Sequence, residues 1–358
     1  MNVNEFFGDI HGNFGFGYMR LPMIGEEVDI EESTRMVDEF MKRGFNYFDT
    51  AHGYIDGKSE LALKECLTKR YDRKSYILTN KLTDNFFNCR EDIRPVLEAQ
   101  LEACGVEYFD FYLMHSQHSG NFPKYKECKA YETALELKEE GKIKHLGISF
   151  HDSAEVLDMI LSEYPQIEVV QIQFNYLDYE DPVNQSRLCY EVCRKHNKPI
   201  IVMEPVRGGS LVNLPKAART LMSSLKEGSP ASYAIRYAAS FSGVMMVLSG
   251  MSNMEQMLDN VTHMENFVPL TEYEKNILYQ VADIIKEQNK IPCTACRYCV
   301  KDCPMGIHIP ELFKAYNERG SYELSKASAC IKCGKCEAVC PQHLEIRNLL
   351  DKVAEELE

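Results

Sequence analysis

Eight of the fourteen cysteines in this chain of 358 residues follow one spacing rule near its C-terminal end. The rule is C-x2-C-x2-C-x3-C-P, and it occurs at Cys293, Cys296, Cys299 and Cys303 and again at Cys330, Cys333, Cys336 and Cys340. In bacterial ferredoxins with two clusters, such a run places three thiolates on one cluster and the fourth on the other. The two runs therefore predict two [4Fe–4S] clusters with crossed ligands, and a protein that moves electrons.

Two other uses of clustered cysteines fit this spacing less well. Zinc sites commonly pair two C-x2-C units across a longer loop, and disulfide frameworks belong to small proteins of oxidising compartments. Iron–sulfur ligation is therefore the favoured interpretation. We expect the six remaining cysteines to pack as small apolar groups; they are Cys66, Cys89, Cys104, Cys128, Cys189 and Cys193.

A second set of reactive side chains follows three consecutive strand-like segments. Its members are Asp49, Tyr54, Lys81 and His115. A phenol with a pKa of about 10 needs a neighbouring ammonium group to act as an acid or base at neutral pH. A carboxylate would hold that ammonium group, and an imidazole would orient a substrate oxygen. Taken singly, each residue also has a structural explanation as a cap or a rim residue.

The elements that must position these side chains alternate regularly. Eight strand-like runs are separated by helix-like segments, at 13–21, 47–51, 76–82, 108–116, 145–150, 169–175, 199–206 and 245–251. Eight such units over about 250 residues predict a TIM (β/α)8 barrel, whose active site lies where the strands end. A doubly wound open sheet is the rival fold, but no G-x-G-x-x-G follows the first strand-like run.

The expected organisation is therefore α/β, with a barrel and a small, mainly helical iron–sulfur domain at the C-terminal end. We place the barrel at 1–269, a connecting helix at 270–291 and the two-cluster domain at 292–358. The connecting helix would span about 28 Å at 1.5 Å per residue. Whether it brings the cysteine runs to the barrel mouth or lies across the opposite end is left open by the sequence.

Composition excludes several classes of protein. The chain is 45% hydrophobic and 26% charged, as in ordinary globular proteins, and no apolar run reaches the roughly 18 residues of a membrane span. The stretch 1–17 lacks the basic start and apolar core of a signal peptide, so we expect a cytoplasmic protein. A net charge of −14 argues against nucleic acid as a partner.

The motifs around the second set resemble those of the aldo-keto reductase family. They are FDTAHGY at 48–54, TNK at 79–81 and YLMHS at 112–116. The resemblance extends over roughly 13–264, and the appended cysteine runs are similar to those of an iron–sulfur subgroup of that family. It implies a small carbonyl substrate and a nicotinamide that gives hydride directly to the carbonyl carbon. It also implies that Tyr54 is the general acid.

The same resemblance assigns the other three members of the second set. Lys81 would activate the phenol, Asp49 would hold Lys81, and His115 would orient the substrate. It further implies nucleotide contacts at Gly17, Ser149, Gln171, Met203, Arg207, Gly209, Gly250, Gln256, Asp259 and Asn260.

These nucleotide positions differ from the family pattern in several places. Ser149 and Gln171 match the contacts to the carboxamide, but Met203 stands where an aromatic residue normally stacks on the nicotinamide. Gly250 and Gln256 replace the lysine and arginine that grip the 2′-phosphate in NADPH-preferring members. A phosphate without cations loses its charge-assisted hydrogen bonds, so the sequence does not favour NADPH.

The remaining nucleotide positions follow the pattern. Arg207 and Gly209 flank a loop that would meet the pyrophosphate through its backbone amides. Asp259 and Asn260 match the pair that contacts the adenine.

Three functions are compatible with this combination. The clusters pass electrons to or from the barrel site, or they are structural or sense oxygen in an ordinary carbonyl reductase, or the barrel is an idle scaffold of an electron-transfer protein. A cubane carries one electron and a hydride carries two, so the first function needs an intermediary such as a flavin or a conjugated substrate. No flavin motif is evident, and a flavin stays open. An electron-transfer protein would then be a further partner.

Overall fold

A computed structural model describes residues 7–225, 228–288 and 290–358. Residues 1–6 of the expected barrel domain lie outside the described residues, as do residues 226–227 and residue 289 of the expected connecting helix. Contacts divide the chain into two compact units. One comprises Met1–Pro205 and Leu225–Lys275, and the other comprises Val206–Ser224 and Asn276–Glu358.

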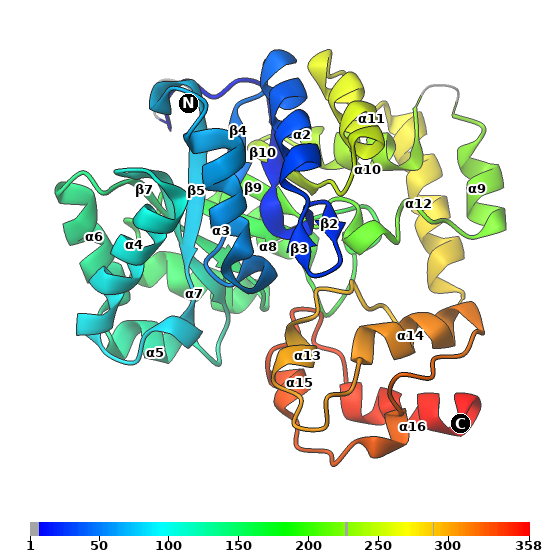
Figure 1. The fold of residues 1–358 in the computed structure, drawn as a ribbon. Coiled ribbons are helices and arrows are strands. Elements are labelled where there is room, and N and C mark those ends of the chain that lie inside the picture. Colours follow the sequence, from blue (N-terminus) through cyan, green and yellow to red (C-terminus); the bar gives the residue numbers. More distant parts are fainter. Residues whose placement is uncertain (1–6, 226–227, 289) are drawn as a thin grey trace. The chain divides into compact units, whose positions relative to one another are not determined.

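The first unit is a closed barrel of eight parallel strands (Figure 1). Around the barrel the order is β1-β10-β9-β8-β7-β6-β5-β4, so the first and last strands are neighbours. The strands are β1 Phe14–Gly17, β4 Tyr47–Asp49, β5 Ile77–Leu82, β6 Phe109–Gln117, β7 Ile143–Phe150, β8 Val169–Gln173, β9 Ile200–Met203 and β10 Val244–Gly250. Each predicted strand-like run corresponds to one of them, and the predicted TIM barrel is confirmed.

Helices follow the strands and cover the barrel. The main ones are α2 Ile30–Lys42, α3 Lys58–Leu63, α4 Arg90–Cys104, α6 Ala130–Glu139, α7 Ala154–Glu163, α8 Ser186–Lys195, α10 Pro230–Ala239 and α11 Met254–Glu265. Helix α2 illustrates how the sequence forms them: Asp29 caps it by accepting the N–H of Glu32 at 2.9 Å, and Met36 and Phe40 are buried on its inner face. No helix among the described residues is long and apolar enough to cross a membrane.

Smaller elements join these helices and strands. They are the hairpin β2 Met23–Ile24 and β3 Glu27–Val28, the short helix α5 Phe122–Glu127, and several single 3-10 turns. The barrel interior is closely packed: a Cβ atom on Gly147 would lie 2.5 Å from Leu113, so only glycine fits there.

The second unit is mainly helical. It contains α9 Lys216–Met222, α13 Tyr298–Lys301, α14 Ile309–Glu318, α15 Lys335–Ala338 and α16 Ile346–Leu357, and α12 Glu272–Lys286 crosses the division between the units. Its hydrophobic core includes Phe313 and Leu350 and also the cysteines Cys299 and Cys336, each 7% exposed. The thiols are therefore part of the packed interior of this unit.

The segment that directly follows β9 belongs to this second unit. It begins with the 3-10 turn Arg207–Gly209, in which Gly208 adopts φ 59°. A Cβ atom on Gly208 would lie 2.2 Å from the carbonyl oxygen of Thr294, the residue after Cys293. Glycine is required here because the two backbones touch. The domain boundaries expected from the sequence stay predictions.

Candidate active site and cysteine cavities

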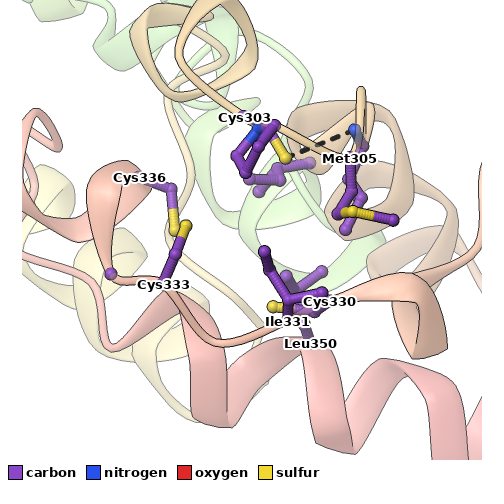
Figure 2. Close-up of a pocket in the computed structure, with 11 residues that line it drawn as sticks. Cys303, Met305, Cys330, Ile331, Cys333, Cys336 and Leu350 are labelled. Atoms are coloured by element: carbon purple, nitrogen blue, oxygen red, sulfur yellow. Dashed lines mark hydrogen bonds between the residues drawn. The ribbon is translucent and has the colours of Figure 1, made fainter.

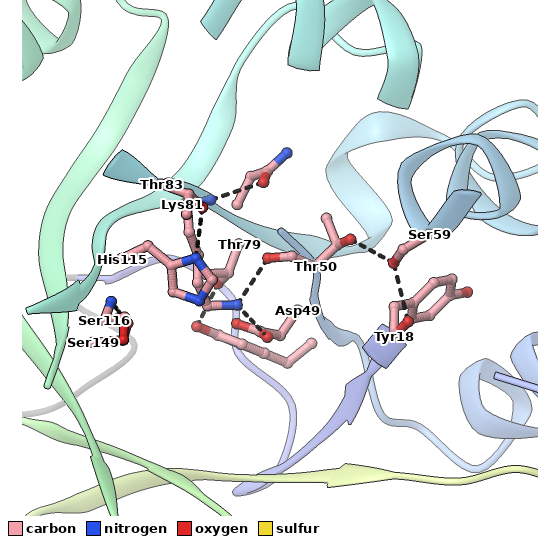
Figure 3. Close-up of polar contacts among 12 residues, drawn as sticks. Tyr18, Asp49, Thr50, Ser59, Thr79, Lys81, Thr83, His115, Ser116 and Ser149 are labelled. Carbon is pink, nitrogen blue, oxygen red and sulfur yellow. Dashed lines mark hydrogen bonds and ion pairs between the residues drawn. The ribbon is translucent and has the colours of Figure 1, made fainter. Parts of the chain in front are cut away.

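Lys81 and Asp49 form a buried ion pair at the carboxyl ends of β5 and β4 (Figure 3). The Lys81 Nζ atom donates to Asp49 Oδ1 at 2.6 Å and to the backbone carbonyl of Thr50 at 2.8 Å. The two strands are hydrogen-bonded neighbours, which is why residues far apart in sequence meet. Burial lowers the pKa of Lys81 and raises the pKa of Asp49, and the pairing opposes both shifts.

Tyr54 lies beside this ion pair. Its ring centroid is 4.8 Å from Lys81 Nζ and 5.8 Å from the ring of His115, which it meets edge to face. The two residues after it, Ile55 and Asp56, both have left-handed backbone conformations, with φ 52° and 53°. This conformation is rare for a β-branched residue, and such strain is concentrated at functional sites.

His115 completes the group at the end of β6. Its side chain is buried, and its Nδ1 atom shares a hydrogen bond of 2.6 Å with the hydroxyl of Thr83 (Figure 3). Burial lowers the pKa of His115 well below its usual value, and the charges of Lys81 and His151 act in the same direction. The imidazole is therefore neutral at physiological pH, which suits a group that orients a substrate oxygen by a hydrogen bond.

A buried network connects the segment of Tyr54 to the strand of Lys81. Glu60, 1% exposed, accepts from Asn80 Nδ2 at 2.7 Å and pairs with His52 Nδ1 at 2.7 Å. Asn80 Oδ1 in turn accepts the backbone N–H of Lys81 at 2.8 Å.

The backbone carbonyl of Lys81 is held by a side-chain amide, as its backbone N–H is. Gln100 Nε2 donates to the Lys81 carbonyl at 2.9 Å and to Asn80 Oδ1 at 3.0 Å. Sequence reasoning missed this network, because its members are a helix residue, a loop histidine and two amides with no motif spacing.

The nicotinamide positions Ser149 and Gln171 lie side by side. They are register partners on β7 and β8 and are both buried. Ser149 Oγ accepts the N–H of Ser116 at 2.7 Å. The buried Gln171 Oε1 has no hydrogen-bond partner among the described residues. A carboxamide that donates an N–H to this oxygen would satisfy it, so these residues fit the group the resemblance implies.

Three more nucleotide positions lie at strand ends of the first unit. Gly17 closes β1 between Asp49 on one side and Gly250 on the other. Met203 closes β9 and is only partly buried. Gly17, Met203 and Gly250 therefore lie at the carboxyl-terminal end of the barrel, and their contacts with a nucleotide stay predictions.

The two residues of the expected adenine pair on α11 have different hydrogen-bond partners. Asp259 accepts from the hydroxyl of Ser229 at 2.5 Å, and His263 lies 3.8 Å away. Asn260 is buried and donates to Ser249 Oγ at 3.2 Å, while its Oδ1 atom has no partner among the described residues.

The remaining expected contacts differ in their surroundings. Gln256 is exposed and its Oε1 accepts the N–H of Ser252 at 2.8 Å. Arg207 and Gly209 belong to the second unit, where Arg207 is 5% exposed and has φ 49°.

The eight cysteines of the two runs line two cavities of the second unit. Although no three His, Cys, Asp or Glu side chains of the described residues are placed to hold a single metal ion, four thiols line each cavity. One cavity is lined by Cys303, Cys330, Cys333 and Cys336 (Figure 2), the other by Cys293, Cys296, Cys299 and Cys340. This grouping is the crossed one that the spacing predicts.

Hydrogen bonds to sulfur in the two cavities also fit [4Fe–4S] clusters. The two cavities have similar volumes, about 310 and 320 Å³ including space open to solvent. Backbone N–H groups two to four residues after a cysteine donate to its sulfur at 3.4 Å, at Cys293, Cys303 and Cys330. Hydrogen bonds to sulfur stabilise the charged, cluster-bearing form of such ligands.

Five of the six other cysteines are buried, as expected; Cys89 is exposed at the start of α4. It therefore does not pack as an apolar group, because the N-cap position of a helix faces solvent.

A sequence model described as "Aldo/keto reductase family" matches residues 13–283, and one described as "4Fe-4S dicluster domain" matches residues 292–344. The chain belongs to the aldo/keto reductase family and carries a 4Fe-4S dicluster domain after the barrel. It is thus an oxidoreductase enzyme. The resemblance stated from the motifs is confirmed.

Two relatives each cover about two thirds of this chain. The NADH-specific methylglyoxal reductase of Escherichia coli (strain K12) is 24% identical over 289 residues, which are 68% of this chain and 85% of the relative. An aldo-keto reductase of Mycolicibacterium vanbaalenii is 28% identical over 247 residues, or 67% and 82% of the two chains.

Solved structures share the fold. The aldo-keto reductase AKR11C1 of Bacillus halodurans in its holo form has a TM-score of 0.63 at 23% identity, covering 76% of this chain and 93% of the other. An aldo-keto reductase of Klebsiella pneumoniae in complex with NADPH has a TM-score of 0.61 at 17% identity, covering 75% and 90%.

Proposed function

We propose that the enzyme reduces a small carbonyl or conjugated substrate at the barrel mouth, with two [4Fe–4S] clusters as an electron relay. The observation that carries this proposal is the contact of Tyr54 with the buried Lys81–Asp49 pair and with a neutral His115. A bound nicotinamide dinucleotide would supply the hydride. Gln171, Ser149 and the other strand-end residues are the groups that would hold it.

The residues of the chain supply the proton and the orientation. Tyr54 donates its hydroxyl proton to the carbonyl oxygen while hydride adds to the carbon, so that the C=O group becomes an alcohol. The ammonium group of Lys81 stabilises the phenolate that remains. Asp49 keeps Lys81 in place, and His115 donates a hydrogen bond that fixes the substrate oxygen.

The cysteine runs would hold the two clusters, each of which exchanges one electron at a time. Their participation in turnover is supported by the loop 207–209, the expected pyrophosphate contact, which packs through Gly208 on the residue after Cys293. The proposal includes an external electron-transfer protein as the partner that exchanges electrons with the clusters. Free thiols and clusters suit a reducing compartment, so a cytoplasmic location belongs to the proposal as well.

A second function is favoured by one specific observation. Cys299 and Cys336 lie in the core of the second unit, and most of the other ligands pack against it. Clusters bound there would stabilise the fold whether or not they carry electrons during turnover. The enzyme would then be an ordinary nicotinamide-dependent carbonyl reductase.

Two variants separate these possibilities. Tyr54→Phe removes only the hydroxyl, and we expect loss of carbonyl reduction by about three orders of magnitude with nucleotide binding intact. Undiminished turnover would overturn the role of Tyr54.

Cys333→Ser tests the relay, because Cys333 is an exposed ligand whose replacement spares the core. The proposal predicts loss of cluster-dependent turnover in a folded protein. Full nicotinamide-dependent turnover would favour the structural alternative. An anaerobic EPR titration of the reconstituted protein with NADH checks directly whether the nucleotide reduces the clusters.

A further inference from the structure

The start of α11 is occupied by acceptors that belong to the protein. The N–H of Met254 donates to the carboxylate of Glu32 at 3.0 Å, and the N–H of Gln256 donates to Asn253 Oδ1 at 2.9 Å. Two residues before the helix begins, the N–H of Ser252 donates to Gln256 Oε1 at 2.8 Å. Helix N-termini attract anions through such free N–H groups and the helix dipole. Here a carboxylate from another helix, α2, already fills that role.

Glu32 is held firmly in this position. Its side chain is 16% exposed, and its second oxygen is paired with Arg35 one turn further along α2. Asp29 caps the same helix by accepting the backbone N–H of Glu32. Hydrogen bonds and an ion pair therefore hold both the backbone N–H and the carboxylate of Glu32.

The resemblance places the 2′-phosphate of a nucleotide between positions 250 and 256. Gly250 has no side chain, and the Gln256 side chain is neutral and engaged with Ser252. A phosphate brought here would meet the negative charge of Glu32 and would compete with it for the N–H of Met254. Adenosine without that phosphate brings no such charge.

We infer that Glu32 is a specificity-determining residue that excludes the 2′-phosphate and makes the enzyme select NADH over NADPH. The inference rests on the proposed function, since it requires that a nicotinamide dinucleotide binds at the barrel mouth. It adds that selectivity comes from a repelling charge as well as from missing cations.

Besides Arg35, which is paired with Glu32, the positively charged residue near this loop is Arg20. A Cβ atom on Gly250 would lie 3.1 Å from the Cβ of Arg20, so the arginine stem covers the glycine. The backbone carbonyl of Arg20 accepts the Ser252 hydroxyl at 2.9 Å. If Arg20 gripped the phosphate, the wild-type protein would prefer NADPH, and Arg20→Met would abolish that preference.

Equilibrium binding of NADH and NADPH to the holoenzyme, followed by nucleotide fluorescence, tests the inference. Wild type should bind NADH more tightly, and Glu32→Gln should lower the Kd for NADPH about tenfold with the Kd for NADH little changed. The glutamine keeps an acceptor for Met254, so the fold is preserved. Glu31→Gln, on the same turn but exposed, removes an equal charge and should change neither Kd.

The outcomes are distinct. An unchanged NADPH Kd in Glu32→Gln, or an equal gain in Glu31→Gln, overturns the inference while NADH binding still supports the proposed function. A wild-type preference for NADPH that is lost in Arg20→Met overturns it as well. If neither nucleotide binds wild type, the nucleotide part of the proposed function fails together with the inference.

Discussion

The active-site group of the barrel and the two cysteine cavities are positioned by different means. Lys81 and Asp49 stand on neighbouring strands whose backbones are hydrogen-bonded to each other. The cysteines stand on loops and on helices of four residues, α13 and α15, and two of them form part of the core they line. Strand pairing therefore positions the reactive groups of the barrel, whereas we expect the cysteine unit to depend on clusters bound by its thiols for part of its stability.

The largest expected effect is on the barrel side. Lys81→Met should lower kcat about a thousandfold, because Tyr54 loses the ammonium group that stabilises its phenolate. Steady-state kinetics measures this effect, and cluster content measured as iron should stay normal. Lys58→Met, which removes an exposed pair with Glu27, is the matched control. Loss of iron in Lys81→Met would show that the two regions are not independently positioned.

The second-largest effect is expected in the second unit, on its iron content and its stability. Cys336→Ala removes a core thiol that is also a predicted cluster ligand, so iron content should drop and the free energy of unfolding should fall by about 3 kcal/mol. Iron analysis and chemical denaturation under anaerobic conditions check both values. Cys89→Ala, at an exposed helix start, should change neither. Full stability of Cys336→Ala would contradict the dependence of this unit on its ligands.

A smaller effect is expected where the segment after β9 meets the first cysteine run. Gly208→Ala would place a methyl group 2.2 Å from the Thr294 carbonyl oxygen at a left-handed residue. We expect a loss of about 2 kcal/mol in stability from the forced backbone shift. Gly306→Ala provides a comparison, since its left-handed φ is 61° but no atom lies within 4 Å of the added Cβ. Equal losses in the two variants would mean that the backbone conformation alone matters.

The smallest effect concerns the network behind Lys81. Glu60→Gln should lower kcat about tenfold and leave KM nearly unchanged, because Lys81 and Tyr54 lose their common support. In the wild-type protein, the hydrogen bond between His52 and Glu60 raises the pKa of His52 above its ordinary value. This pairing stabilises the fold below the unfolded pKa and is lost as pH rises through the raised folded pKa.

The free energy of unfolding of the wild-type protein should accordingly fall as the pH rises through the folded-state pKa of His52, and that of Glu60→Gln should not. Thermal unfolding measured across this pH range tests the difference. A pH dependence that is identical in both proteins would remove His52 from the network.

The sequence predicts contacts that follow a period or a spacing rule. Strand ends fall at equivalent positions of a barrel, so Asp49, Lys81 and His115 could be placed at one face from the alternation alone. The crossed grouping of the cysteines follows likewise from a spacing rule.

The structure was needed for contacts without such a rule. Glu32 and Met254 are separated by most of the barrel sequence, and their meeting depends on how α2 packs beside α11. The approach of Gly208 to Thr294 is equally unpredictable, because a glycine in a loop has many possible partners.

The crossed lining of the two cavities also sets when clusters could be inserted into the chain. Each cavity is completed by a cysteine from the other run: Cys303 joins the set that ends at Cys336, and Cys340 joins the set that begins at Cys293. During synthesis, the first set is complete only once Cys336 has been added and the second only once Cys340 has been added. Clusters held by these thiols would therefore be inserted after both runs are made, and a chain that stops between the runs would have a complete set of thiols for neither cavity.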